Sequence, residues 1–337
     1  MNLRCIIPIV FLVISTNVYS QEVKHQGQVD ILKRLQSEDL NIKLRAIRSS
    51  KYQFVYKGKE KQVVKLLIDA TKHQNDKIVA NALSSLRWTC YLADKKMITL
   101  ALFELLQHSN PKVCERSRIV LNEIHRDILD ALPESGDPIP CLVDSLEGWT
   151  GFEFFCSTNA DPYFTRRISA ATILQYLGEK SIPQLQLALT SNTGSLRHGA
   201  LVVIMNIRLS NKNSKDVITQ STYNTIVENL SHEHDGVRYQ AGETLIVFGK
   251  TGIKTLYKVL QSGNLKAQET ALWRLWYHDK ITLIPILVEK YQKNELRETI
   301  IDLWKNIRSD EIQQIEEKLG METRNFIEEE VNRYKNE

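Results

Sequence analysis

The sequence DGVRYQAGETLIVFG at residues 235–249 carries the pattern that decides the fold. Asp235 is suited to cap a helix, because its carboxylate can accept hydrogen bonds from free backbone N–H groups of the first turn. Apolar residues then recur at the three- and four-residue spacing of one helical face, from Val237 to Phe248. Gly249 suits the left-handed conformation that ends many helices. The stretch therefore predicts one amphipathic helix with defined ends.

The same pattern recurs along the chain. One small or compact residue near the middle of each predicted helix marks its position. These positions are Ala46, Ala82, Ser117, Ala170, Ala200, Ala241, Ala271 and Ile300. Their successive spacings are 36, 35, 53, 30, 41, 30 and 29 residues, and most of these fall in the range of helical repeat proteins. One helix pair cannot bury its apolar side alone, so the pairs are expected to stack.

The stretch at 235–249 resembles the second helix of HEAT repeats, and the short period is most similar to the HEAT-like repeats first named from bilin lyases. Weaker copies are LRHGA at 196–200 and LRETI at 296–300. The resemblance covers about residues 27–307 and implies an all-α, right-handed superhelical solenoid of about eight helix pairs, with the second helices on its concave side. It also implies a ladder of acidic and basic side chains between repeats, on Asp235 with Arg238 and on Arg197 and Arg297. The ladder would be interrupted where Val79, Cys114 and Gln268 take the basic position.

Composition agrees with a globular helical protein. The chain has 337 residues, with 44 Lys and Arg, 40 Asp and Glu, and 42% apolar residues, which excludes collagen-like, disordered and multi-span membrane proteins. Its 14 Gly and 8 Pro are too few for a turn-rich β-sandwich. The net charge of +4 does not require a nucleic-acid partner, and none is expected.

Residues 1–20 have the anatomy of a secretory signal peptide. Arg4 precedes an apolar run at 5–14 that is too short to span a bilayer, and Val18 and Ser20 suit cleavage before Gln21. The alternative is a buried N-terminal helix. We expect a secreted or periplasmic protein whose mature chain, starting at residue 21, has no transmembrane segment. The repeats would cover 21–309, and a helical cap with a Glu-rich face would cover 310–337.

The longest spacing between repeats contains an insertion at 147–162, between a predicted first helix at 138–146 and a second helix at 164–177. Its aromatic residues are Trp149, Phe152, Phe154 and Phe155. They either fold back onto the repeats or bind a partner, since long loops in compact folds are often functional. In an oxidising compartment a disulfide between Cys141 and Cys156 could close the insertion, and free thiols are the alternative.

The second-helix surface supplies the other partner-binding candidates, because aromatic residues and arginine are frequent in binding centres. They are Arg48, Arg87, Trp88, Arg116, Arg166, His198, Tyr239 and Trp276. A position in the core or on a solvated face is the alternative for each of them. The pair His232 and His234 has a metal-ligand spacing, but a polar turn that ends in a helix cap explains it better.

No catalytic, cofactor or metal motif stands out in the sequence. The sequence therefore predicts a non-catalytic exported scaffold that binds a protein or peptide through its concave face and the 147–162 loop. A lyase-like enzyme or enzyme subunit is the alternative. A deep pocket that gathers His, Asp or Glu would favour the enzyme, and a shallow groove the scaffold.

Overall fold

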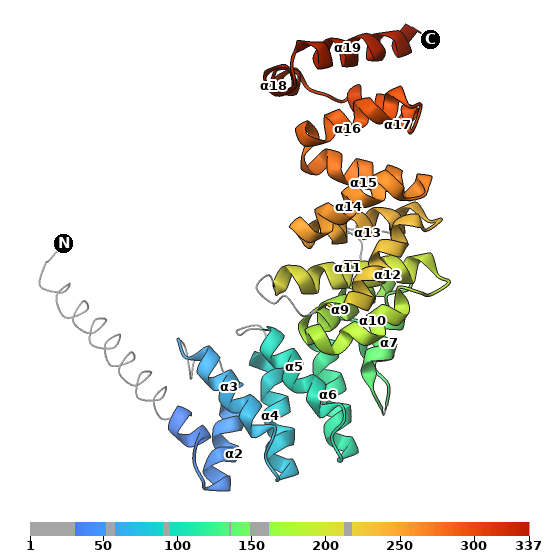
Figure 1. Ribbon diagram of the computed structural model, residues 1–337. Coiled ribbons are helices and arrows are strands. Elements are labelled where there is room, and N and C mark those ends of the chain that lie inside the picture. Colours follow the sequence, from blue (N-terminus) through green and yellow to red (C-terminus); the bar gives the residue numbers. More distant parts are fainter. Residues whose placement is uncertain are drawn as a thin grey trace, which may run out of the picture. The chain divides into compact units, whose positions relative to one another are not determined.

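The computed structural model describes residues 31–51, 58–89, 95–134, 136–148, 162–211 and 218–336, and within these ranges all regular structure is helical (Figure 1). The described chain divides into two compact units. The first contains residues 31–145 and 162–177, and the second contains residues 146–148 and 178–336. Among the helices so described, none combines the length and the apolar character needed to cross a bilayer.

The first unit is a stack of helix pairs. A short helical segment at 31–35 precedes α2, and the later pairs are α3 with α4, α5 with α6, and α7 with α9. The second helices α2, α4 and α6 pack against one another in order, and the first helices α3 and α5 also touch. The elements are α2 (Leu40–Ser49), α3 (Glu60–Ala70), α4 (Asp76–Thr89), α5 (Lys95–Leu105), α6 (Pro111–Ile124), η3 (Leu129–Ala131), α7 (Pro138–Asp144) and α9 (Pro162–Leu177).

The second unit repeats the same arrangement. Its pairs are α10 with α11, α12 with α13, α14 with α15, and α16 with α17, and the pair α18 and α19 follows them. The elements are η4 (Gly178–Ser181), α10 (Ile182–Ala188), α11 (Gly194–Ser210), α12 (Gln220–Glu228), η5 (Asn229–Ser231), α13 (Asp235–Val247), α14 (Lys250–Ser262), α15 (Leu265–His278), α16 (Lys280–Gln292), α17 (Arg297–Trp304), α18 (Ser309–Leu319) and α19 (Met321–Asn336).

The eight residues used to detect the repeat all lie on second helices. Each is at most 1% exposed. Consecutive second helices pack together from α2 to α6 and from α11 to α17, so a longer side chain at these positions would push the packed helices apart. The predicted all-α fold of HEAT-like helix pairs is confirmed by this arrangement.

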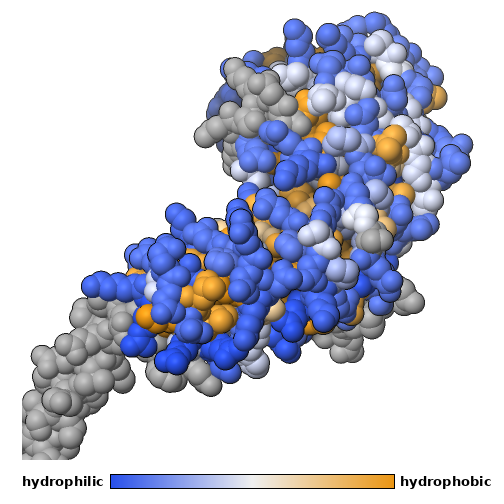
Figure 2. Space-filling model, turned by 90° about the horizontal axis from the view of Figure 1, so that it is seen from below, coloured by the Kyte–Doolittle hydropathy of each residue, from blue (hydrophilic) through white to orange (hydrophobic). Residues whose placement is uncertain are grey.

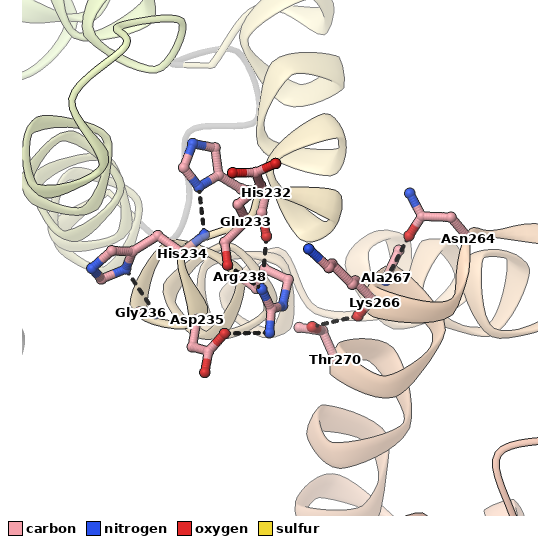
Figure 3. Close-up of polar contacts among 10 residues, drawn as sticks. All are labelled: His232, Glu233, His234, Asp235, Gly236, Arg238, Asn264, Lys266, Ala267 and Thr270. Atoms are coloured by element: carbon pink, nitrogen blue, oxygen red, sulfur yellow. Dashed lines mark hydrogen bonds and ion pairs between the residues drawn. The ribbon is translucent and has the colours of Figure 1, made fainter.

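Three of the residues expected to cap second helices do so, namely Asp39, Asn110 and Asn264, whereas Asp76, Ser195, Asp235 and Asn294 do not. Asp39 accepts hydrogen bonds from two backbone N–H groups of α2, and Asn264 caps α15 through the N–H of Ala267. Asp235 was expected to cap α13, but it is the first residue of that helix. The cap is His234, whose Nδ1 accepts a hydrogen bond from the Gly236 N–H at 3.1 Å (Figure 3). The structural interpretation of the His232/His234 pair as a capping turn therefore holds.

At α6, α11, α13 and α15 the residue at the expected ladder position holds the turn before its second helix. Val79 of α4 has no side-chain donor, and Arg297 of α17 instead pairs with Glu330 of α19. Arg238 Nη1 donates to the carbonyl oxygens of His232 and Glu233, both at 2.8 Å, and Arg238 Nη2 pairs with Asp235 at 2.5 Å (Figure 3). These contacts of Arg238 all lie within one repeat. The ladder between repeats that the family resemblance implied is therefore wrong for Asp235 and Arg238.

Residues other than arginine hold the same turn. Arg197 donates to the carbonyl six residues earlier. Cys114 Sγ does so at 3.0 Å, and Gln268 Nε2 donates to the carbonyl five residues earlier at 2.6 Å. Cys114 and Gln268 were expected to interrupt the pattern, yet they continue it, because the turn requires a side-chain donor rather than a positive charge. Arg197 additionally reaches Asn229 Oδ1 of the next repeat at 3.1 Å.

Candidate binding surface

Three positions on each second helix face away from the buried small residue. They lie one residue before it, two after it and five after it, so that they line up along the helix at three-residue spacing. On α2, α4 and α6 all nine are exposed or half-buried. We call these nine residues the second-helix face of the first unit: Arg45, Arg48, Lys51, Asn81, Ser84, Arg87, Arg116, Ile119 and Asn122.

Two open depressions lie on this face. One, of about 480 Å³, lies between α2 and α4, and its lining includes Arg45, Arg48 and Lys51. The other, of about 420 Å³, lies between α4 and α6, and its lining includes Arg87, Arg116 and Ile119. Asn81 and Ser84 of α4 line both depressions. The two depressions therefore adjoin, with α4 as their common wall.

The charge of this face has one sign. Five of its nine residues are Arg or Lys, and no Asp or Glu lines either depression. Arg48 Nε donates to Asn81 Oδ1 at 3.0 Å, which bridges α2 and α4. Within the described residues, Arg45 and Arg116 form no ion pair, so their charge is directed to solvent.

One carboxylate borders the face. Glu123 of α6 pairs with Arg87 of α4 at 2.5 Å, and this ion pair bridges the two helices above the second depression. Surface ion pairs of this kind are screened by solvent and contribute little to stability. The pair fixes the position of Arg87 more than it strengthens the stack.

Apolar side chains accompany the cations. Trp88 is 54% exposed, and the Arg87 guanidinium lies 5.5 Å from the centroid of its ring. Ile119 is 39% exposed on the wall of the second depression. On the view of the molecule in Figure 2, hydrophilic side chains dominate and apolar side chains form separate patches between them. Large exposed aromatic and aliphatic groups beside arginine are typical of binding centres.

The structure brings four of the sequence candidates together. Arg48, Arg87 and Arg116 line the depressions, and Trp88 adjoins Arg87. Arg166 does not join them. It lies on α9, where its Nη2 pairs with Asp130 Oδ2 at 2.9 Å and its Nε donates to the Asp127 carbonyl at 3.3 Å.

Two candidates of the second unit are not on the surface. Trp276 is 2% exposed and His198 is 4% exposed, so their predicted surface positions are wrong. Trp276 packs in the core with the Lys280 ammonium 5.2 Å from its ring. His198 enters the core because Gly236 has no side chain: a Cβ there would lie 3.1 Å from His198 Nδ1.

Tyr239 is exposed, but one side of its ring is covered. The Arg274 guanidinium lies 3.8 Å from the ring centroid, and Arg274 pairs with Glu243. Gly242 makes this possible, since a Cβ there would overlap the Arg274 side chain. This cluster joins α13 to α15 and leaves Arg274 buried, so it serves packing.

The remaining predicted residues lie elsewhere. Trp149, Phe152, Phe154, Phe155 and Cys156 fall outside the described residues, so the aromatic insertion and the disulfide stay predictions. Cys141 is half-buried on α7. In the part of the chain that the structure describes, no three His, Cys, Asp or Glu side chains gather in a way that could hold a metal ion.

Sequence reasoning missed six residues of the second-helix face: Arg45, Lys51, Asn81, Ser84, Ile119 and Asn122. A signal was present, because each stands at a fixed offset from a small residue of its second helix. The corresponding twelve positions on α11, α13, α15 and α17 contain one cation, Lys305, and two carboxylates, Glu243 and Asp302; five of the twelve are buried, namely Gly199, Val202, Gln240, Thr270 and Trp276. The cationic character thus belongs to the first unit alone.

The sequence matches no family model and no curated protein. Among solved structures it is similar to importin beta, at 12% identity and a TM-score of 0.33, over 82% of this chain and 40% of that one. It is also similar to human deoxyhypusine hydroxylase, at 14% identity and a TM-score of 0.27, over 76% of this chain and 97% of that one. The third is the CpcE–CpcF complex of phycocyanin lyase from a Nostoc species, at 16% identity and a TM-score of 0.25, over 74% of this chain and 86% of that one. This chain thus spans well under half the length of importin beta. Its paired helices and the buried small residue of each second helix make it an all-α protein of HEAT-like repeats.

Proposed function

We propose that this protein is a non-catalytic scaffold that binds a protein or peptide through the second-helix face of the first unit. The observation that carries the proposal is the pair of adjoining open depressions, lined by five cations and by no carboxylate. Open, shallow surfaces of this kind suit an extended partner, whereas small-molecule sites enclose most of their ligand.

The titratable groups with the largest pKa shifts lie outside the second-helix face of the first unit. An active site gathers groups with shifted pKa in one pocket. The two groups whose pKa is lowered most are His125 and His198, each to about 4, and burial is the main cause for both. Neither lines a depression of the second-helix face, and each is enclosed in the core of its own unit.

Export and the aromatic insertion belong to the same proposal. Residues 1–20 would direct the chain out of the cytoplasm, and residues 147–162 would add apolar contacts to the partner. Sequencing the N-terminus of protein recovered from an extracytoplasmic fraction tests export. Gln21 as the first residue is the expected result, and an intact Met1 in the cytoplasm would contradict it.

A photo-crosslinking amino acid at Ser84 tests the binding face directly, because Ser84 lies in the common wall of both depressions. The matched control places the same group at Lys65, which is exposed on the first helix α3. We expect a discrete adduct from position 84 that is absent from position 65 and is lost when Arg45 and Arg116 are replaced by Gln. Equal adducts from both positions, or none from either, would overturn the proposal.

A further inference from the structure

We propose that the second-helix face of the first unit binds an extended acidic peptide segment that carries a carboxylate at every third residue. This inference rests on the proposed function and names the partner's chemistry. Two properties of the face lead to it: the sign of its charge, and the regular spacing of the helices that carry the charge.

The charge calls for an anionic partner. Arg45 and Arg48 lie three residues apart on α2, Lys51 follows just after the end of that helix, and α6 adds Arg116; the α4 cation, Arg87, is already paired with Glu123. Like charges gathered on one surface repel each other, and bound carboxylates would relieve that repulsion. Because the equivalent positions of the second unit lack this excess, the repeat architecture does not itself require it.

The spacing selects an extended peptide. The second helices α2, α4 and α6 pack side by side (Figure 1), and the axes of packed helices are about 8–10 Å apart. A polyproline II chain has three residues per turn and rises about 3.1 Å per residue, so one side of it repeats about every 9 Å. A peptide that crosses the helices in this conformation therefore presents every third side chain to a new helix. In a β-strand the side chains of one face repeat about every 7 Å, which does not match the spacing of the helix axes.

The uncharged residues suit the rest of such a peptide. Asn81 and Ser84 stand on the wall between the depressions, where their side chains can hydrogen-bond the peptide backbone. The backbone of a polyproline II segment makes no internal hydrogen bonds, so its polar groups are available. Trp88 and Ile119 offer exposed apolar surface to the residues between the carboxylates.

A peptide fits this face better than a nucleic acid does. Nucleic-acid binding relies on many phosphate contacts, and its usual footprint is a strongly basic protein. Here the net charge of the whole chain is only +4, and the cations are separated by neutral and apolar residues. A nucleic acid or a sulfated polysaccharide therefore serves as a competing outcome in the test.

Three peptides of equal length separate the charge from the spacing. The first repeats Glu-Pro-Pro five times, the second has the same composition with all Glu residues in one block, and the third replaces each Glu by Gln. Binding to the full chain is followed by the anisotropy of a labelled peptide and by the fluorescence of Trp88, with Trp88→Phe to identify its signal. We expect the regular acidic peptide to bind at least tenfold more tightly than the block isomer, and the Gln peptide to show no binding.

Variants locate the site. The double variant Arg45→Gln/Arg116→Gln should weaken binding of the regular peptide at least tenfold. The control Lys61→Gln/Lys65→Gln removes two exposed charges from α3 and should leave binding unchanged. All four residues are exposed, so circular dichroism should show both double variants to be folded. The single variant Arg48→Gln provides a further test of the binding face.

Each other outcome has a defined meaning. Equal binding of the regular and block peptides would refute the three-residue spacing. Tighter binding of duplex DNA or heparin than of any peptide would refute the partner class. If no peptide binds but the position-84 adduct persists, this inference fails and the proposed function stands. If the adduct is also absent, both fail.

Discussion

Lowering the pH from 7 to 5 should destabilise both units, because each buries one neutral histidine. In the first unit His125 is 6% exposed, and its Nε2 lies 2.7 Å from the hydroxyl oxygen of Thr99. That hydroxyl already donates to the Lys95 carbonyl at 2.8 Å, so Nε2 must carry the proton and donate to Thr99. Burial, and then the Lys95 charge, lower the pKa of His125 to about 4.

In the second unit His198 behaves similarly for a partly different reason. Burial is the main cause that lowers its pKa to about 4, and the nearby His234 lowers it further. The nearby Gly236 backbone raises the pKa of His198 and so acts in the opposite direction. Both histidines therefore stay neutral in the folded protein down to a pH well below the value at which they titrate in the unfolded chain.

The sign and size follow from proton linkage. Between the unfolded pKa of 6.5 and the folded value of about 4, the unfolded chain holds more protons, so the free energy of unfolding falls as the pH falls. At pH 5 each histidine should account for a loss of about 2 kcal/mol, which rises to about 3.4 kcal/mol below pH 4. Carboxylates remain largely ionised at pH 5, so this window isolates the histidines.

Urea denaturation followed by circular dichroism at pH 7 and pH 5 measures the effect. His125→Gln and His198→Gln should each remove about 2 kcal/mol of the pH dependence from their own unit, since an amide cannot protonate in this range. His278→Gln, at an exposed position on α15, is the matched control for replacing an imidazole by an amide. An unfolding free energy that is equal at the two pH values in the unsubstituted protein would refute the reasoning.

Three further predictions concern packing. Gly252→Ala should destabilise the second unit by about 2 kcal/mol in denaturant titrations despite its better helix propensity, because the new Cβ would lie 1.8 Å from the Leu245 carbonyl oxygen; unchanged stability would contradict this close approach. Trp276→Ala should cost about 3–5 kcal/mol, since the side chain is fully buried, and a loss below 1 kcal/mol would place Trp276 on the surface. Arg238→Ala should cost about 1–2 kcal/mol by freeing two turn carbonyls, while Arg238→Gln should recover most of it; equal losses would refute the turn-lock role.

A third of the second-helix face of the first unit could be predicted, and the failures have physical causes. Arg48, Arg87 and Arg116 were found because exposed arginines on second helices share one face. Trp276 and His198 were misplaced because periodicity gives the direction of a side chain only to within part of a turn. At the border of a helical face, the neighbouring residues decide whether a side chain is buried or exposed. His198 is buried because Gly236 leaves space that its ring fills.

The sequence by itself determined the repeat, its period, the buried small or compact residue of each second helix and some of the caps. These features depend on local spacing, which a helix of fixed geometry converts directly into faces and ends. Tertiary structure alone decided which exposed residues become neighbours across helices. Arg45 and Arg116 are 71 residues apart in the chain, and they share one surface because α2, α4 and α6 pack side by side. A binding surface is therefore a property of the stack, since its residues come from different repeats.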